Sequence, residues 1–349
     1  MASGCVARAT ASACSRTPSA QPATAVAPTP TPLEPLQITV APVSLRPTKR
    51  LLKFVGTLFG LVFGSFLNVV IFRLPRMMDR EWVSGIPGAL EESKETRDRE
   101  RAGRLAAQVR DEIAHLATPE ARLNLVVPRS RCPACGHGIT ALENIPLLSY
   151  LALRGKCSAC GARISAKYPF VELLAGVGGS YAAWRFGFSL AALGAALFTW
   201  CTIALAVIDQ ETGFLPDSLT LPLMWAGLLL NIGGTYVPLA DAVVGAAAGY
   251  LTLWLIYQGY KLLFRKEGMG YGDFKMLAAV GAFVGWKLLP LVILLSSVVG
   301  LFFGVLQMLA SRRGWDSSFR FHFGPYLAVA GVVALFWGEP ILRWYLHRL

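Results

Sequence analysis

The chain has 349 residues, of which 54% are hydrophobic and only 15% are charged, and its mean hydropathy is +0.50. A soluble globular protein would be about a quarter charged, so the composition excludes an ordinary soluble enzyme. The net charge of +12 comes from Lys and Arg residues that lie mostly in loops between apolar runs, as the positive-inside rule describes for membrane proteins. Nucleic-acid binding is therefore not expected.

Residues 1–48 are rich in Ala, Thr, Ser and Pro and contain no apolar run. This composition predicts a disordered extension rather than a signal peptide, which needs an apolar region soon after its start. An organelle transit peptide and a start site placed too far upstream are the alternatives. We assign no function to this segment.

Residues 51–73 are the first predicted transmembrane helix, because about 20 apolar residues can cross a hydrocarbon core. The sequence Arg-Leu-Pro-Arg at 73–76 predicts its end. Gly64 and Ser65 are small enough to allow close helix packing, and Asn68 needs a hydrogen-bonding partner at membrane depth. For Asn68 a structural role is favoured over contact with a substrate.

Residues 77–167 are soluble in character and are expected to form a cytoplasmic domain. Within them, residues 91–117 are dense in charge with apolar residues at helical spacing, which predicts an amphipathic surface helix without chemistry.

Two C-x-x-C pairs follow, Cys132 with Cys135 and Cys157 with Cys160. Two such pairs about twenty residues apart are typical of a tetrahedral zinc site with four thiolate ligands. Four protein ligands leave no open position, so the predicted zinc is structural. A redox dithiol would need a thioredoxin-like βαβ context, and the sequence lacks one. His137 is expected to be a neighbour of the site rather than a ligand.

Residues 168–340 are expected to form a membrane core of seven further helices, which with the first makes an all-α polytopic protein of about eight transmembrane helices. The predicted spans are residues 51–72, 170–184, 190–208, 219–232, 240–264, 274–284, 288–309 and 326–336. The basic loops lie on the side of the cysteine pairs. The cysteine module and the loops at Asp209 and Asp273 are therefore predicted to face the cytoplasm.

Two acids lie at the edges of apolar runs. Asp209 ends one run, and Asp273 follows the glycine-rich stretch at 268–272 and begins another. An ionisable group at membrane depth costs roughly 2.5–3.5 kcal/mol, so both are candidates for function. Capping of a helix start is the competing interpretation of Asp273. Two carboxyl groups in one cavity would share a proton, so that one serves as acid and the other as base toward water, as in aspartic proteases.

Two other acids lie near Asp209. Glu211 is expected to be a solvated loop charge. Asp217 follows a proline and precedes Ser-Leu-Thr, so it is predicted to cap the next helix rather than to act in catalysis.

Six motifs together resemble one known family. They are GSFLNVVIFRLP, NLVVPRSRCPACGH, ENIPLLSYLALRGKCSACGARIS with YPFVELL, IDQETGFLPDSLTLPL, EGMGYGDFKMLAAVGAFVGW and FGPYLAVAG. Over about residues 55–338 the chain resembles the type IV prepilin peptidases, also called leader peptidase/N-methyltransferases. The G-x-G-D motif alone is weak, but with both cysteine pairs in the expected order it is specific.

The resemblance implies a bifunctional enzyme of the bacterial inner membrane. It would cut the leader peptide of prepilins or pseudopilins after a glycine on the cytoplasmic side, and then methylate the new N-terminus with S-adenosylmethionine. It implies Asp209 and Asp273 as the catalytic pair and the four paired cysteines as metal ligands. The sequence shows no glycine-rich nucleotide motif, so no residue is assigned to the methyl donor.

Two other classes of function are compatible with a polytopic chain. A non-enzymatic transporter or assembly scaffold, with the zinc module docking a partner, would favour inverted repeats and acids at mid-membrane. Here the acids lie at the ends of spans and no repeat is evident. A presenilin-like intramembrane protease would share the G-x-G-D motif but gives no reason for the cysteine module.

Overall fold

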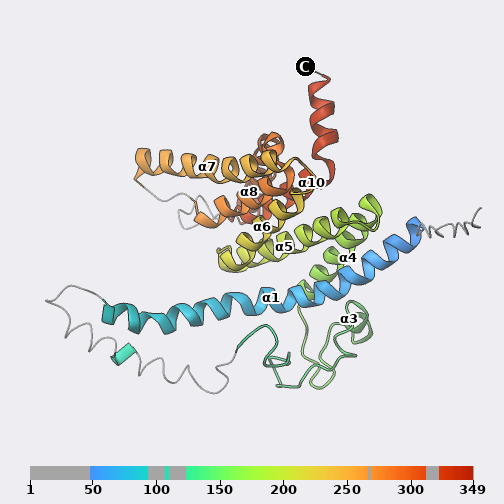
Figure 1. Ribbon diagram of the computed structural model, residues 1–349. Coiled ribbons are helices and arrows are strands. Elements are labelled where there is room, and N and C mark those ends of the chain that lie inside the picture. Colours follow the sequence, from blue (N-terminus) through green and yellow to red (C-terminus); the bar gives the residue numbers. More distant parts are fainter. Residues whose placement is uncertain (1–47, 93–106, 110–122, 266–268, 312–321, 349) are drawn as a thin grey trace, which may run out of the picture. The chain divides into compact units, whose positions relative to one another are not determined.

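The computed structural model describes residues 48–92, 107–109, 123–265, 269–311 and 322–348, and within these ranges it contains helices and two isolated β-bridges but no strand. The long helices are α1 Lys49–Glu92, α4 Lys167–Phe186, α5 Leu190–Thr212, α6 Asp217–Asn231, α7 Leu239–Phe264, α8 Tyr271–Val284, α9 Leu289–Ser311 and α10 Gly324–Leu346 (Figure 1). A short helix α3 Leu148–Ala152 and a 3-10 turn Trp286–Leu288 complete the set.

Among the described residues, five helices are long and apolar enough to cross a membrane: Lys49–Ile86 of α1, then α5, α7, Trp286–Leu306 and α10. The all-helical fold is confirmed, and each of the eight predicted runs is helical. The predicted count of eight spans is not confirmed. Helices α6 and α8 have 15 and 14 residues, so they reach only about 22 Å, less than a hydrocarbon core of about 30 Å.

Helix α1 has 44 residues and runs through Pro75, so the predicted helix end at 73–76 is wrong. A proline removes one backbone hydrogen bond, and the helical pattern resumes beyond it. Arg73 is buried and donates to the carbonyl oxygens of Asn124, at 2.9 Å, and Pro128. The predicted extension over 1–48 and the predicted helix over 91–117 lie almost entirely outside the described residues.

Helices α1 and α4 touch through their backbones. A Cβ atom added at Gly56 would lie 2.5 Å from the carbonyl oxygen of Gly179, and one at Gly60 would overlap the carbonyl of Ala175. Such contacts between small residues hold helices together where no hydrophobic effect drives them. Asn68 Nδ2 donates to the carbonyl of Tyr168 at 3.1 Å, which is the interhelical bond that its favoured structural role requires.

Helix α8 is buried among α6, α7 and α10, and every residue from 276 to 284 is inaccessible. Gly281 of α8 and Gly245 of α7 meet so closely that a Cβ atom on either would overlap the carbonyl oxygen of the other. At the far end of α8 the fully buried Asn231 donates to the carbonyl of Ala282 at 2.9 Å. These contacts fix the helix whose first turn carries Asp273.

Replacing Gly281 by alanine should force α7 and α8 apart. We expect a loss of about 1–3 kcal/mol in the free energy of unfolding, the usual effect of overpacking, seen as a lower Tm of the detergent-solubilised protein. Gly259→Ala in α7 is the matched control, because nothing lies within 4 Å of its added Cβ atom. That control should keep or raise the Tm, since alanine favours helix. Equal Tm values for the two variants would contradict the close contact.

Candidate active site and metal centre

Asp209 lies in the last turn of α5 with 6% of its surface exposed. Its Oδ2 atom accepts a hydrogen bond of 3.0 Å from the backbone amide of Gly324, the first residue of α10. The N-terminus of a helix is positively polarised, so this contact favours a carboxylate. A Cβ atom at Gly324 would lie 2.6 Å from Oδ2, so only glycine admits Asp209 at this distance.

Asp273 is the third residue of α8 and is 8% exposed. Its Oδ1 atom is buried and has no hydrogen-bond partner within the described part of the chain. The N-cap position of α8 is Gly270, and no side chain caps the helix. The capping interpretation of Asp273 is therefore wrong. A buried carboxyl oxygen without a partner is costly, and in an enzyme it is available to a substrate or to water.

The two acids come from helices α5 and α8, and the charge of Asp209 acts electrostatically on Asp273. The loop after Asp209 packs against the start of α8, since a Cβ atom at Gly272 would lie 2.7 Å from the Cβ atom of Leu215. The absence of a side chain at Gly272 thus lets the loop after Asp209 approach the backbone beside Asp273. The first glycine of the stretch, at position 268, lies outside the described residues.

His322 and Gly324 also belong to this site, and sequence reasoning gave neither of them a role. His322 interacts electrostatically with Asp209, and its Nε2 atom would lie 3.3 Å from a Cβ atom placed on Gly213. Their position in or beside the motif FGPYLAVAG was the only indication in the sequence that these two residues have a function. This motif comes more than one hundred residues after Asp209. Sequence spacing alone cannot show that the two segments meet.

Glu211 and Asp217, the other two acids near Asp209 in the sequence, are each paired with a lysine. Glu211 Oε1 lies 2.9 Å from Lys167 Nζ, and Asp217 Oδ2 lies 2.6 Å from Lys275 Nζ. Asp217 is the first residue of α6, after the N-cap Pro216, and no side chain caps this helix. The prediction that Asp217 caps a helix is therefore wrong. Its partner Lys275 follows Asp273 by two residues, so the ion pair ties the start of α6 to the start of α8.

The four paired cysteines come together as predicted. Their Sγ atoms all lie within 4.8 Å of one another, and those of Cys132 and Cys160 are 3.9 Å apart. A tetrahedral ion with metal–sulfur bonds of about 2.3 Å would separate its sulfurs by about 3.8 Å. The arrangement therefore fits one thiophilic metal ion.

The two cysteine pairs have the same backbone geometry at an offset of 25 residues. Gly136 donates its amide to the carbonyl of Cys132, and Gly161 does the same to Cys157, both at 2.9 Å. Both glycines are in the left-handed region, with φ of 72° and 70°, where other residues are strained. Backbone hydrogen bonds from Ala134 and Cys135 lower the pKa of the Cys132 thiol to about 7. At Cys135 a backbone hydrogen bond from His137 is outweighed by the neighbouring thiols, which raise the pKa of that thiol to about 12.

Glu143 joins the two cysteine pairs. It accepts a hydrogen bond from Ser158 Oγ and two of 2.8 Å from Thr140, and these bonds lower its pKa to about 2. Its Oε1 atom lies 3.4 Å from His137 Nε2, so His137 contacts Glu143 and stays outside the thiol cluster, as predicted. The Thr-x-x-Glu spacing at 140–143 was the available signal for Glu143.

Comparison with known proteins covers most of the chain. A sequence model of the bacterial peptidase A24 N-terminal domain matches residues 58–186, and one of the type IV leader peptidase family matches residues 196–305. A protein of Aeromonas salmonicida (strain A449) named prepilin leader peptidase/N-methyltransferase is 52% identical over 292 residues, which are 84% of this chain and 93% of that protein.

Proteins of the same name from Pseudomonas aeruginosa and Burkholderia pseudomallei (strain 1026b) are 47% and 46% identical. These matches cover 83% and 84% of this chain, and 92% and 88% of those proteins. No solved structure matches the chain.

A double-mutant cycle can test whether the ion pair between Asp217 and Lys275 contributes to the free energy of unfolding. Both side chains are partly exposed, at 49% and 27%, so Asp217→Asn should lower the free energy of unfolding by no more than about 1 kcal/mol. The effect should vanish in a Lys275→Met background, because the partner is already gone. Chemical denaturation of the four proteins in detergent measures this. If Asp217→Asn lowered the free energy of unfolding equally in both backgrounds, the loss would not come from the ion pair. Asp217 would then stabilise the start of α6 in another way, as a helix cap does.

Proposed function

The chain belongs to the type IV leader peptidase family, and we propose that it removes the leader peptides of type IV prepilins and then N-methylates the residue that cleavage exposes. The observation that carries the peptidase assignment is the pair of buried carboxyl groups, Asp209 and Asp273, brought together from α5 and α8. One of them keeps an oxygen without a partner among the described residues.

The surroundings of the two acids favour different protonation states. Asp209 accepts the amide of Gly324 at the positive end of α10, which supports the ionised form. Asp273 lies in the first turn of α8, which also favours a negative charge, but its buried Oδ1 atom has no donor within the described residues, so we assign the shared proton to Asp273. Asp209 is then the base and Asp273 the acid.

The reaction follows from this division. Asp209 takes a proton from water as the water oxygen bonds to the scissile carbonyl carbon, and Asp273 gives its proton to the carbonyl oxygen. When the C–N bond breaks, Asp209 passes its proton to the leaving nitrogen. Asp273 recovers a proton from one hydroxyl of the tetrahedral intermediate, so the pair returns to its starting state.

For the second activity we propose S-adenosylmethionine as the methyl donor, since the family's name includes an N-methyltransferase. The amine released by cleavage would attack the methyl carbon, lose a proton and release S-adenosylhomocysteine. We assign no residue to this site.

We propose that the metal of the four-cysteine cluster is zinc and that its role is structural. Thiolates are preferred ligands of zinc, and a closed set of four leaves no position for a substrate. The ion would fix the segment between the two cysteine pairs, which Glu143 also holds.

We further propose that the protein lies in the bacterial inner membrane with the cysteine module and the two acids on the cytoplasmic side. The substrates would be prepilins and pseudopilins. In this arrangement residues 77–167, which begin with the last part of α1 up to Glu92, form the cytoplasmic region with the module, and residues 168–340 form the peptidase core. The basic loops on the module's side support this orientation.

Asparagine at either acid tests the proposed pair. Asp209→Asn and Asp273→Asn should each lower the rate of leader cleavage by about 10³-fold or more, because an amide neither accepts nor donates the required proton. Mass spectrometry of the pilin N-terminus, with and without each variant, reports cleavage and methylation together. Both variants should still methylate a pilin supplied without its leader.

Asp217→Asn is the matched control, since that carboxyl is paired with Lys275, and it should keep most of the cleavage activity. Full activity of either Asp209→Asn or Asp273→Asn in a well-folded protein would refute the pair.

Metal analysis tests the cysteine cluster. The purified protein should contain one zinc ion per chain by mass spectrometric elemental analysis. Cys157→Ser should lose the ion and lower the Tm, whereas Cys201→Ser, which lies outside the cluster, should keep the metal. Stoichiometric zinc in the Cys157→Ser protein, or no metal in the wild type, would reject the assignment.

A further inference from the structure

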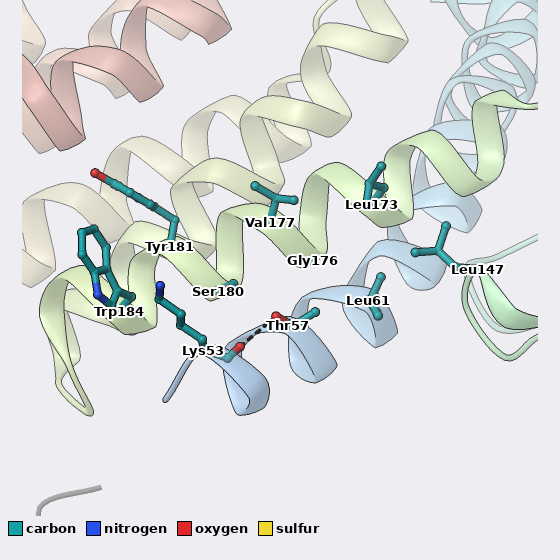
Figure 2. A pocket seen from close by; sticks show the side chains of 10 residues that line it. All are labelled: Lys53, Thr57, Leu61, Leu147, Leu173, Gly176, Val177, Ser180, Tyr181 and Trp184. Atoms are coloured by element: carbon teal, nitrogen blue, oxygen red, sulfur yellow. Dashed lines mark hydrogen bonds between the residues drawn. The ribbon is translucent and has the colours of Figure 1, made fainter. Parts of the chain in front are cut away.

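The segment between the two cysteine pairs contacts α1, within the stretch that is apolar enough to cross a membrane, and the neighbouring helix α4. Asn144 Oδ1 accepts a hydrogen bond of 3.3 Å from Ser65 of α1, and the Leu147 amide donates to Glu172 Oε2 of α4 at 2.9 Å. Leu147 also lines a groove of about 370 Å³ with Leu61 and other residues of α1 and α4 (Figure 2). The segment therefore rests on α1 within its apolar stretch and on the adjoining surface of α4.

The depth of this contact in the membrane can be measured along helix α1. Arg73 ends the apolar run that begins at position 51, and it binds the module's carbonyls at Asn124 and Pro128. Ser65 and Leu61 precede Arg73 by 8 and 12 residues, which is about 12 and 18 Å along the helix. The contacts of Asn144 and Leu147 thus lie two to three turns inside the apolar run.

The same segment exposes leucines. Leu142, Leu148 and Leu151 are 77%, 66% and 70% exposed. Single exposed leucines are ordinary on a soluble surface, but three within ten residues, beside a transmembrane groove, form an apolar patch. Two basic residues, Arg154 and Lys156, follow the patch directly and are exposed. This order of apolar and then basic residues is that of a segment at a lipid interface.

The polar backbone of the segment has partners from the membrane helices. Leu147 has φ of 58°, an unfavourable conformation for leucine, and the buried Glu172 holds its amide. Non-helical backbone is tolerated at membrane depth only where protein groups or water satisfy it. A buried carboxylate inside α4 and a serine inside α1 supply such groups here.

We propose that residues 142–152 insert into the leaflet on the module's side, with Leu142, Leu148 and Leu151 among the acyl chains and Arg154 and Lys156 at anionic headgroups. The segment between the cysteine pairs is then the membrane-inserted part of the module, while the rest of the module lies in water. The other conceivable occupant is the apolar part of a protein substrate. Lipid is favoured because the anchoring contacts lie at bilayer depth and a basic pair closes the segment.

The experiment uses the full chain in vesicles of phosphatidylethanolamine and phosphatidylglycerol. A genetically encoded fluorescent amino acid replaces Leu142, Leu148 or Leu151 in separate proteins, since each side chain is exposed and has room for a larger group. Phe59, exposed on α1 within the apolar run, is the reference for lipid, and Arg129, exposed in the module, is the reference for water. Quenching is measured with acyl-chain spin-labelled phosphatidylcholine and with iodide.

We expect the labels at 148 and 151 to be quenched by the spin-labelled lipid about as strongly as the label at 59, and to resist iodide. The label at 129 should show the opposite pattern. Iodide quenching at 148 and 151 equal to that at 129 would overturn the proposal. Loss of lipid quenching on adding a prepilin would also overturn it, because the patch would then belong to the substrate.

Discussion

The bond between the Gly324 amide and the Asp209 carboxylate is the interaction on which the rest of the site depends. It joins the last turn of α5 to the first turn of α10, two helices that the chain separates by more than one hundred residues. Because a helix N-terminus stabilises an anion, the bond supports the proposal that Asp209 is the charged member of the acid pair. Asp273 lies on α8, which is packed against α6 and α7.

Close backbone contact replaces the hydrophobic effect as the source of rigidity in this protein. Gly245 and Gly281 bring α7 and α8 together, and Gly56 and Gly60 do the same for α1 and α4. Lipid gives apolar side chains no reason to associate, so short distances and interhelical hydrogen bonds must supply the attraction. A helix as short as α8 can be stable here because protein surrounds it on every side.

Local chemistry was predictable from the sequence, and long-range pairing was not. The cysteine spacing predicted the thiol cluster because each pair is formed by one turn of chain. Asp209 and Asp273 were candidates because acids are rare at the edges of apolar runs. The Asp217–Lys275 ion pair joins positions 58 apart, and the contact of Asp209 with Gly324 spans 115. The number of spans stays a prediction beyond the five helices that are long and apolar enough to cross a membrane, since hydropathy reports burial and cannot distinguish burial in protein from burial in lipid.

The two cysteine pairs have the same geometry, and each pair would supply half of one metal site at the base of the segment between them. The proposed metal ion, held by two equivalent halves, would act as a crosslink that closes a loop of about 25 residues. The entropy of closing a loop grows only with the logarithm of its length, so doubling the loop would add only about 0.6 kcal/mol. Stability therefore places little constraint on the length of the segment between the pairs. Residues could therefore be added to this segment at little cost in stability while a crosslink at its base kept its geometry.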